Sequence, residues 1–144
     1  MIKIGLCGLG TVGKSFVEHI DESYNLIKNK IGTDFEITAI ADRSIRKKKY
    51  KDGIKITEDA MSLVNIKDID VIVELIGNVD LSYELLKQSI KNKKHVITAN
   101  KALIAKHGGE LFSLASKHNT FIGFEASVAG AIPIIHAISA NFTN

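Results

Sequence analysis

Cysteine, proline and tryptophan are almost absent from this chain of 144 residues, which contains one, one and none of them. The single cysteine, Cys7, cannot form an internal disulfide and has no partner cysteine for a zinc site. We expect Cys7 to be a small buried residue of the first strand, with a reactive thiol as the alternative. No apolar run approaches the roughly 18 residues that a membrane span needs. The first residues also lack the features of a signal peptide, so we expect a cytoplasmic protein.

A large excess of charge of either sign is also absent. The formal net charge is +3, and much of the basic excess lies in Arg46-Lys47-Lys48-Lys49. No aromatic platform interleaves these residues as it does in surfaces that bind nucleic acids, so we expect a solvated loop and no nucleic-acid partner. The five histidines are too scattered for a zinc pattern and are expected to be surface or packing residues.

The sequence does contain a glycine-rich motif, Gly8-Leu9-Gly10-Thr11-Val12-Gly13. It follows the apolar run of residues 2–7 and precedes a helix-period pattern, which is the context in which G-x-G-x-x-G binds dinucleotides. Gly8 permits the tight turn, Gly10 lets a pyrophosphate approach the backbone, and Gly13 lets the helix pack against the sheet. The anion would then contact the free N–H groups at the start of the helix. An ordinary strand-to-helix turn is the alternative.

Strand and helix patterns alternate along the whole chain. Strands are expected at residues 2–7, 36–41, 54–57, 70–77, 95–98 and 120–124. Helices are expected at residues 11–30 and 58–64, after an N-cap at Asp80, after Gly108-Gly109, and from Pro133. Val12 and Leu81 are placed on the apolar stripes of their helices. This alternation predicts an α/β fold of the Rossmann type, with a doubly wound, mostly parallel sheet.

Ligands of such sheets bind outside the carboxyl ends of the strands, so the residues that follow each strand are the candidates for a site. Asp42 and Arg43 follow the second strand. The acid would accept hydrogen bonds from ribose hydroxyls and favour NAD, whereas the arginine could hold a 2′-phosphate and favour NADP. The sequence leaves this choice open, and a solvated turn pair is the alternative to both.

Three later strand ends supply further candidates. Ile76-Gly77 follows the fourth strand, where a glycine lets the backbone approach the nicotinamide half of a coenzyme, or simply ends the strand. Lys101 follows the fifth strand, and its ammonium group can orient a hydroxyl or carboxylate and exchange a proton. Glu125 follows the sixth strand and is expected either to brace the next loop or to stand beside carbonyl groups that ligate a hard cation.

Four segments taken together resemble homoserine dehydrogenase. They are the glycine motif, Val73-Glu74-Leu75-Ile76-Gly77, Thr98-Ala99-Asn100-Lys101-Ala102-Leu103, and Phe124-Glu125-Ala126-Ser127-Val128-Ala129-Gly130-Ala131-Ile132-Pro133. Their order and spacing agree along nearly the whole chain, and the last two are far more specific than the glycine motif. The resemblance implies an NAD(P)-dependent oxidoreductase that interconverts L-homoserine and L-aspartate 4-semialdehyde, on the route to threonine, methionine and isoleucine.

The resemblance also implies roles for individual residues. The coenzyme phosphates would contact Leu9, Thr11 and Val12, and the adenosine end would lie near Arg43. The nicotinamide side would be lined by Ile76, Gly77, Ala99 and Lys101. Lys101 matches a lysine beside coenzyme and substrate, so it is the catalytic candidate. The positions that bind a sodium ion in the family match Glu125, Val128, Gly130 and Ile132.

The same resemblance divides the chain. Residues 1–132 would form the dinucleotide-binding domain, and residues 133–144 would begin a truncated substrate and dimerisation domain. The family's other catalytic lysine and its acidic substrate-binding residues belong to that later domain. We therefore expect these residues to bind NAD or NADP but to turn over homoserine poorly, and the full-length protein to form a homodimer. A non-catalytic NAD(P)-binding or sensing module is the alternative function.

Overall fold

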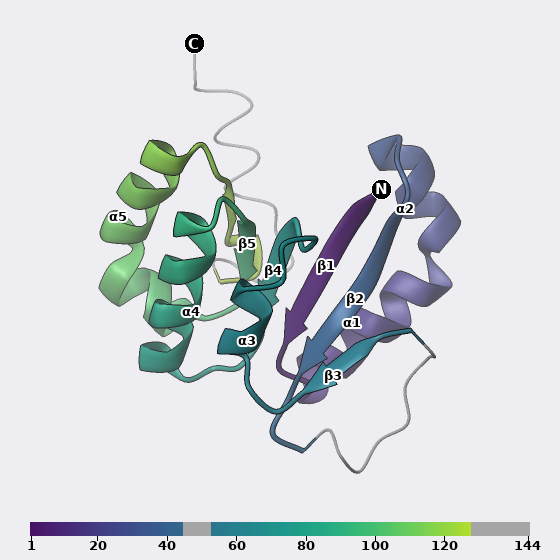
Figure 1. The fold of residues 1–144 in the computed structure, drawn as a ribbon, viewed down its shortest axis with the longest axis horizontal. Coiled ribbons are helices and arrows are strands. Elements are labelled where there is room, and N and C mark those ends of the chain that lie inside the picture. The colour runs from purple at the N-terminus through teal and green to yellow at the C-terminus, as the bar shows by residue number, and fades with distance from the viewer. Residues whose placement is uncertain (45–52, 128–144) are drawn as a thin grey trace.

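The structure is a computed structural model that describes residues 1–44 and 53–127 as one parallel sheet with helices on both faces (Figure 1). The described residues form six strands: β1 (Ile2–Cys7), β2 (Phe35–Ala41), β3 (Lys55–Thr57), β4 (Val71–Glu74), β5 (His95–Thr98) and β6 (Ile122–Gly123). Their order is β3-β2-β1-β4-β5-β6, and all neighbouring pairs are parallel. The strand order therefore reverses between β1 and β4, which confirms the predicted Rossmann-type fold.

Helices cover the sheet on both faces (Figure 1). One face carries α1 (Thr11–Glu22) and α2 (Tyr24–Ile31), and the other carries α3 (Met61–Val64), α4 (Val79–Lys91) and α5 (Lys101–His118). A short 3-10 helix, η2 (Glu125–Ser127), follows β6. Among the helices of the described chain, none has both the length and the apolar character that a membrane crossing requires.

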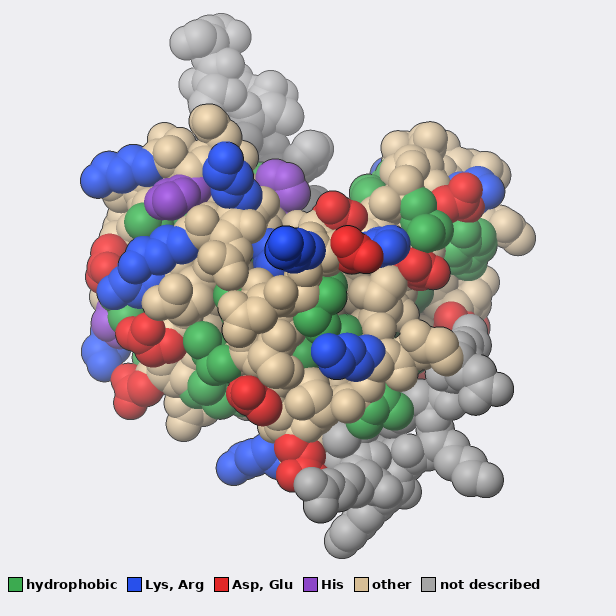
Figure 2. All heavy atoms as spheres, viewed as in Figure 1, with side chains coloured by type: hydrophobic (Ala, Val, Ile, Leu, Met, Phe, Trp, Pro, Cys, Tyr) green, Lys and Arg blue, Asp and Glu red, His purple; other side chains and the backbone are tan. Residues whose placement is uncertain are grey.

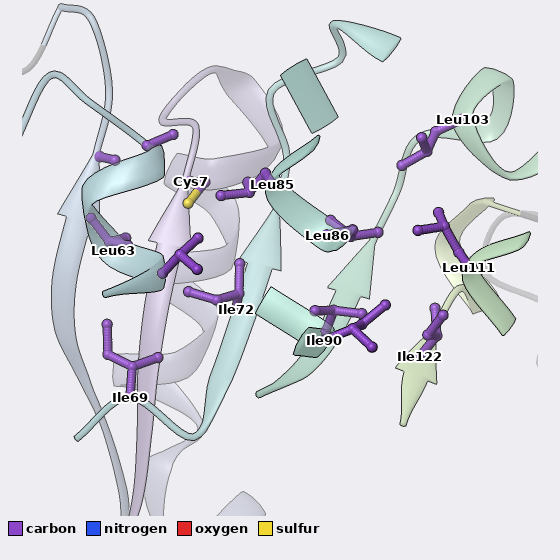
Figure 3. Close-up of a cluster of buried hydrophobic side chains, with 14 of the residues drawn as sticks. Cys7, Leu63, Ile69, Ile72, Leu85, Leu86, Ile90, Leu103, Leu111 and Ile122 are labelled. Carbon is purple, nitrogen blue, oxygen red and sulfur yellow. The ribbon is translucent and has the colours of Figure 1, made fainter. Parts of the chain in front are cut away.

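Two clusters of buried side chains hold the described layers together. The smaller cluster lies between the sheet and α1–α2 and contains Leu6 and Ile40. The larger cluster lies under α3, α4 and α5 and includes Ile72 of β4, Leu86 of α4 and Leu111 of α5 (Figure 3). Each fully buried leucine or isoleucine contributes about 1.5–3 kcal/mol relative to exposure. The strands therefore have apolar side chains on both faces, as expected for a parallel sheet between two helical layers.

The first helix is interrupted, whereas the sequence predicts a single helix over residues 11–30. Ser23 separates α1 from α2 with a ψ of 12°, well away from helical geometry. Its hydroxyl lies 3.5 Å from Nδ1 of His19, a local side-chain contact of the kind that competes with helix continuation. Gly32 ends α2 in the left-handed conformation, which glycine adopts without strain. Val12 is wrongly placed on an apolar stripe, because it is 60% exposed.

The starts of α4 and α5 also differ from those predicted. Asn78 caps α4, because its Oδ1 accepts the N–H of Leu81 at 2.9 Å, so Asp80 lies within the first turn. Asn100 caps α5 in the same way through the N–H of Leu103 at 3.0 Å. Gly108-Gly109 therefore lies inside α5, where packing against α4 outweighs the low helix propensity of glycine. Leu81 is 40% exposed and does not belong to the core stripe.

Replacement of Asn78 by alanine should lower the free energy of unfolding by about 1 kcal/mol, because the N–H of Leu81 loses its acceptor. Asp80→Ala is the matched control, since Asp80 is exposed and forms an ion pair with the exposed Lys106 at 3.7 Å. Exposed ion pairs contribute about 0–1 kcal/mol, so its effect should be smaller. Urea denaturation of both variants, followed by circular dichroism, measures the difference. If the Asp80 variant lost more stability than the Asn78 variant, Asp80 and not Asn78 would be the N-cap residue of α4.

Cys7 is fully buried at the end of β1, as predicted. Burial, followed by the negative charges of Glu74 and Asp59, raises the pKa of the Cys7 thiol from 9.0 to about 12. The thiol therefore stays protonated in the folded protein over a pH range in which it ionises in the unfolded chain. A thiol in this state is a packing group and a poor nucleophile.

Alkaline pH should consequently destabilise the fold through Cys7. The raised pKa is that of an acid, so its contribution is fully present below pH 9.0 and is lost as the pH rises towards 12. Within this window the free energy of unfolding should fall by up to about 1.4 kcal/mol per pH unit. Urea denaturation from about pH 8 to pH 10 should show a shallower pH slope for Cys7→Ala than for the parent. The cavity left by the shorter side chain shifts both ends of that range equally, so equal slopes would contradict the role of Cys7.

Candidate functional site

The glycine motif forms the turn between β1 and α1, and its three glycines have different surroundings. Gly8 has a φ of +102°, and a Cβ there would lie 2.6 Å from the carbonyl oxygen of Leu75. A Cβ on Gly13 would lie 2.1 Å from the carbonyl oxygen of Gly8, whereas a Cβ on Gly10 would meet nothing within 4 Å. The fold therefore requires glycine at positions 8 and 13, and Gly10 leaves the backbone open to a ligand.

The start of α1 offers backbone donors to an anion. Gly10 is the N-cap residue, so no side chain accepts a hydrogen bond from the first turn, and that turn contains no acidic residue. The first N–H groups of a helix have no intrahelical partners and lie at the positive end of its dipole. A phosphate or pyrophosphate is the group that such a helix start binds best.

Asp42 connects the end of β2 to the glycine motif. Its Oδ2 accepts the N–H of Leu9 at 2.7 Å. Its Oδ1 accepts the N–H and the hydroxyl of Ser44 at 2.8 and 2.5 Å. The acid that the sequence proposes as a ribose ligand therefore also holds the glycine turn in place, since Leu9 lies between the first two glycines.

A pocket of about 410 Å³ opens at the carboxyl ends of β1, β2 and β4. It lies where the strand order reverses, which is the position at which doubly wound sheets bind their ligands. The pocket brings together predicted site residues from separate parts of the chain: Gly8, Gly10, Asp42, Arg43 and Ile76. Two glycines of the motif and the two residues expected at the adenosine end thus share one cavity with the first residue of the nicotinamide side.

The other predicted residues of the described chain do not line this pocket. Leu9 and Gly13 are buried, and Thr11 and Val12 are exposed on the first turn of α1. Gly77 is exposed after β4 with a φ of +80°. Ala99 is half-buried after β5, and Lys101 is the exposed first residue of α5. These last three residues lie at the carboxyl edge of the sheet, on the side of β4 and β5.

Further lining residues lie outside the predicted set: Ala41, Glu58, Asp59, Ala60, Leu75, Asn78 and Leu81. Glu58 and Asp59 follow β3, a strand of three residues, and sequence reasoning missed them. The signal was present in the sequence, because the rule that places ligands at strand ends applies to short strands too. Acidic side chains therefore line the pocket beside Arg43.

Glu74 is another residue that the sequence reasoning missed. It ends β4 and is fully buried. Its Oε1 accepts the N–H groups of Ile76 and Gly77 at 2.7 and 3.3 Å, and its Oε2 accepts the hydroxyl of Thr98 at 2.5 Å. An acid at the end of an otherwise apolar strand was the available signal, because a buried carboxylate requires hydrogen-bond partners.

The predicted sodium site is only partly within the described residues. Glu125 is half-buried and opens η2, whereas Val128, Gly130 and Ile132 lie outside the described residues, as does the helix predicted from Pro133. Across residues 1–44 and 53–127, no group of three or more His, Cys, Asp or Glu side chains is placed to hold a metal ion. The carbonyl ligands that the resemblance implies for sodium stay a prediction.

Basic and acidic side chains are interspersed over the face shown in Figure 2. They form no continuous basic surface on that face among the residues drawn in colour. A continuous basic surface is the usual electrostatic footprint of a protein that binds nucleic acids. This face therefore gives no support to a nucleic-acid partner.

The chain matches a family model described as "Homoserine dehydrogenase, NAD binding domain" over residues 8–125. It is 43% identical to the homoserine dehydrogenase of Pseudomonas aeruginosa over 147 aligned positions, which cover 99% of this chain and 34% of that protein. The crystal structure of a homoserine dehydrogenase from Thiobacillus denitrificans matches with a TM-score of 0.88 and 39% identity, covering 95% of this chain and 32% of that one.

A hyperthermophilic archaeal homoserine dehydrogenase, solved in complex with NADPH, shares the fold with a TM-score of 0.81 at 24% identity, over 98% of this chain and 49% of that one. The chain thus spans about a third of the length of the two more similar relatives. The family model covers the glycine motif, the strand ends and the segment that contains Lys101. The fold, the glycine turn and these matches lead to one conclusion: the chain belongs to the family of NAD-binding domains of homoserine dehydrogenases.

Proposed function

We propose that this chain is the coenzyme-binding part of an enzyme that interconverts L-homoserine and L-aspartate 4-semialdehyde with NAD or NADP. The observation that carries the proposal is the pocket at the strand-order reversal, which opens onto Gly10 and the start of α1. That arrangement suits the pyrophosphate of a dinucleotide. The family match then supplies the substrate pair.

Within this proposal the coenzyme lies across the carboxyl edge of the sheet. Its adenosine ribose lies near Asp42 and Arg43, its pyrophosphate at the glycine turn, and its nicotinamide beyond Ile76 and Gly77. A bound nicotinamide ring supplies the hydride chemistry. Lys101, the exposed first residue of α5, would orient the substrate hydroxyl and exchange its proton. Catalysis by Lys101 requires the substrate domain, which the resemblance places after residue 132.

The choice between the two coenzymes depends on the charges at the adenosine end. Arg43 favours a 2′-phosphate, whereas Asp42, Glu58 and Asp59, which line the same pocket, disfavour one. Calorimetric titration of the parent and of Arg43→Ala with both coenzymes separates these effects. If Arg43 holds the 2′-phosphate, the variant should lose about tenfold in affinity for NADP and little for NAD.

Titration with NAD and NADP also tests the proposed function itself. We expect heat of binding from the folded chain but very little homoserine oxidation, and robust oxidation when the following domain is present. Folded protein that binds neither coenzyme would overturn the proposal.

The non-catalytic sensing module is the second candidate, and it would be favoured if a longer protein bound coenzyme but lacked turnover. The sodium site, the boundary at residue 132, the homodimer and the cytoplasmic location stay predictions of the resemblance and the sequence.

A further inference from the structure

The buried carboxylate of Glu74 links two loops at the carboxyl edge of the sheet. Both loops are expected to lie near the nicotinamide, and in this respect the inference rests on the proposed function. Glu74 is aligned with Cys7 of β1 and with Thr98 of β5 across the sheet. Register partners in neighbouring strands point to the same face, so these side chains form a row beneath the starts of α4 and α5. The row marks the carboxyl ends of the strands, directly under the loops that lead into both helices.

Hydrogen bonds continue from Glu74 in both directions. On one side its Oε1 accepts the N–H groups of Ile76 and Gly77, the two residues after β4 that are expected near the nicotinamide. On the other side its Oε2 accepts the hydroxyl of Thr98. The Oγ1 of Thr98 in turn accepts the N–H of Asn100 at 3.0 Å, next to Lys101. One carboxylate therefore joins the loop after β4 to the segment that precedes α5.

The chemistry of this position selects an acid. Two N–H groups and one hydroxyl donate to it, and a carboxylate is an acceptor on both oxygens. A glutamine would keep one accepting oxygen for the loop after β4. Its amide group would face the Thr98 hydroxyl as a donor, and the Thr98 proton would then lose its acceptor. Burying a charged group is costly, so an apolar side chain would fill this position at a lower cost in free energy if packing were its only role.

The far end of this network has an unmet donor. Asn100 is 8% exposed, and its Oδ1 is used to cap α5. Its Nδ2 is buried and has no hydrogen-bond partner among the described residues. An unpaired buried amide is the kind of group that a bound ligand or an ordered water satisfies. The network thus ends in the segment where Ala99 and Lys101 are expected to meet the nicotinamide.

We propose that Glu74 is a positioning residue for the nicotinamide half of the coenzyme. It fixes the distance between the Ile76-Gly77 loop and the Thr98–Lys101 segment, and the ring binds between them. The adenosine and pyrophosphate half depends instead on the glycine turn and on Asp42, whose hydrogen bonds to Leu9 and Ser44 do not involve Glu74. Breaking the network should therefore affect one half of the coenzyme and spare the other.

The test compares NAD with ADP-ribose, which lacks the nicotinamide ring, by calorimetric titration of four proteins. They are the parent chain, Glu74→Gln, Thr98→Val and Ser89→Ala. Thr98→Val removes the hydrogen bond between Thr98 and Glu74, whereas Glu74→Gln places an amide donor opposite the Thr98 hydroxyl, whose proton then loses its acceptor. Ser89→Ala is the matched control, because it removes a buried hydroxyl that donates only to the carbonyl of Leu85 at 2.7 Å. Thermal melts of all four proteins establish that they are folded.

We expect the parent to bind NAD more tightly than ADP-ribose. Glu74→Gln and Thr98→Val should each reduce the affinity for NAD about tenfold, the effect of a lost hydrogen bond that orders a binding loop. Their affinity for ADP-ribose should stay within about twofold of the parent, which is below the effect of a net hydrogen bond. Ser89→Ala should bind both compounds as the parent does.

Other results separate this inference from the proposed function. If the folded parent binds neither NAD nor ADP-ribose, the proposed coenzyme site itself is wrong. A parent that binds both equally, or folded variants that lose both affinities in parallel or neither, leave the coenzyme site intact and overturn the role of Glu74. If Glu74→Gln does not fold, Thr98→Val decides the question alone, because valine keeps the shape of threonine and replaces its hydroxyl with a methyl group.

Discussion

A Gly13→Ala variant should lose about 3 kcal/mol of folding stability or more, at or above the upper end of the usual range for overpacked positions. A Cβ at position 13 would stand 2.1 Å from the carbonyl oxygen of Gly8. That oxygen is backbone, and Gly8 itself lies against Leu75 with a φ of +102°. Neither group can move aside without opening the turn between β1 and α1. The loss should appear as a lower urea midpoint in denaturation followed by circular dichroism.

Gly109→Ala provides the matched control for this experiment. Gly109 is exposed within α5, and a Cβ there would meet nothing within 4 Å. Alanine in an unobstructed helix interior stabilises by about 0.5–1 kcal/mol relative to glycine. The two substitutions add the same methyl group to glycines in helices, and they should change stability in opposite directions. A Gly13 variant as stable as the parent would show that the turn can relax, and the steric account of the motif would be wrong.

The sequence was sufficient for the sheet because its signals are local. An apolar strand such as Val71–Glu74, a glycine turn and an amphipathic helix each identify themselves within a few residues. The parallel direction of the strands follows, because a strand that is reached through a helical crossover runs in the same direction as the strand before it. The candidate residues at the ends of β2 and β4 could be placed for the same reason, since the carboxyl edge of a parallel sheet is fixed by chain direction alone.

Features that depend on partners far along the chain were less accessible. Asp42 was predicted to bind ribose, but its contact with Leu9 spans 33 positions and appears only once β1 and β2 pair. Gly108-Gly109 looked like a helix boundary, and only the packing of α5 on α4 shows why the helix continues through it. The bond from Glu74 to Thr98 joins residues 24 positions apart on neighbouring strands. No local pattern at Glu74 identifies that partner.

Gly10, the second glycine of the motif, is expected to be needed for coenzyme binding, whereas Gly13, the third, is needed for the fold. Gly10→Ala tests this difference. Gly10 has a φ of −66° and a ψ of −162°, an extended conformation that alanine adopts without strain. Gly10 lines the pocket, and a Cβ added there would meet no atom beyond its chain neighbours within 4 Å. The free energy of unfolding should therefore change by about 1 kcal/mol at most, the cost of alanine at an N-cap.

Coenzyme affinity should respond far more strongly to the same substitution. A methyl group at position 10 occupies the space through which a pyrophosphate reaches the first N–H groups of α1. We expect the Kd for NAD and for ADP-ribose to rise about 10- to 100-fold, which corresponds to about 1.4–2.7 kcal/mol. Gly109→Ala, at a position that is not among the pocket-lining residues, should leave both values unchanged. An unaltered Kd in a folded Gly10 variant would mean that the pyrophosphate does not approach this turn.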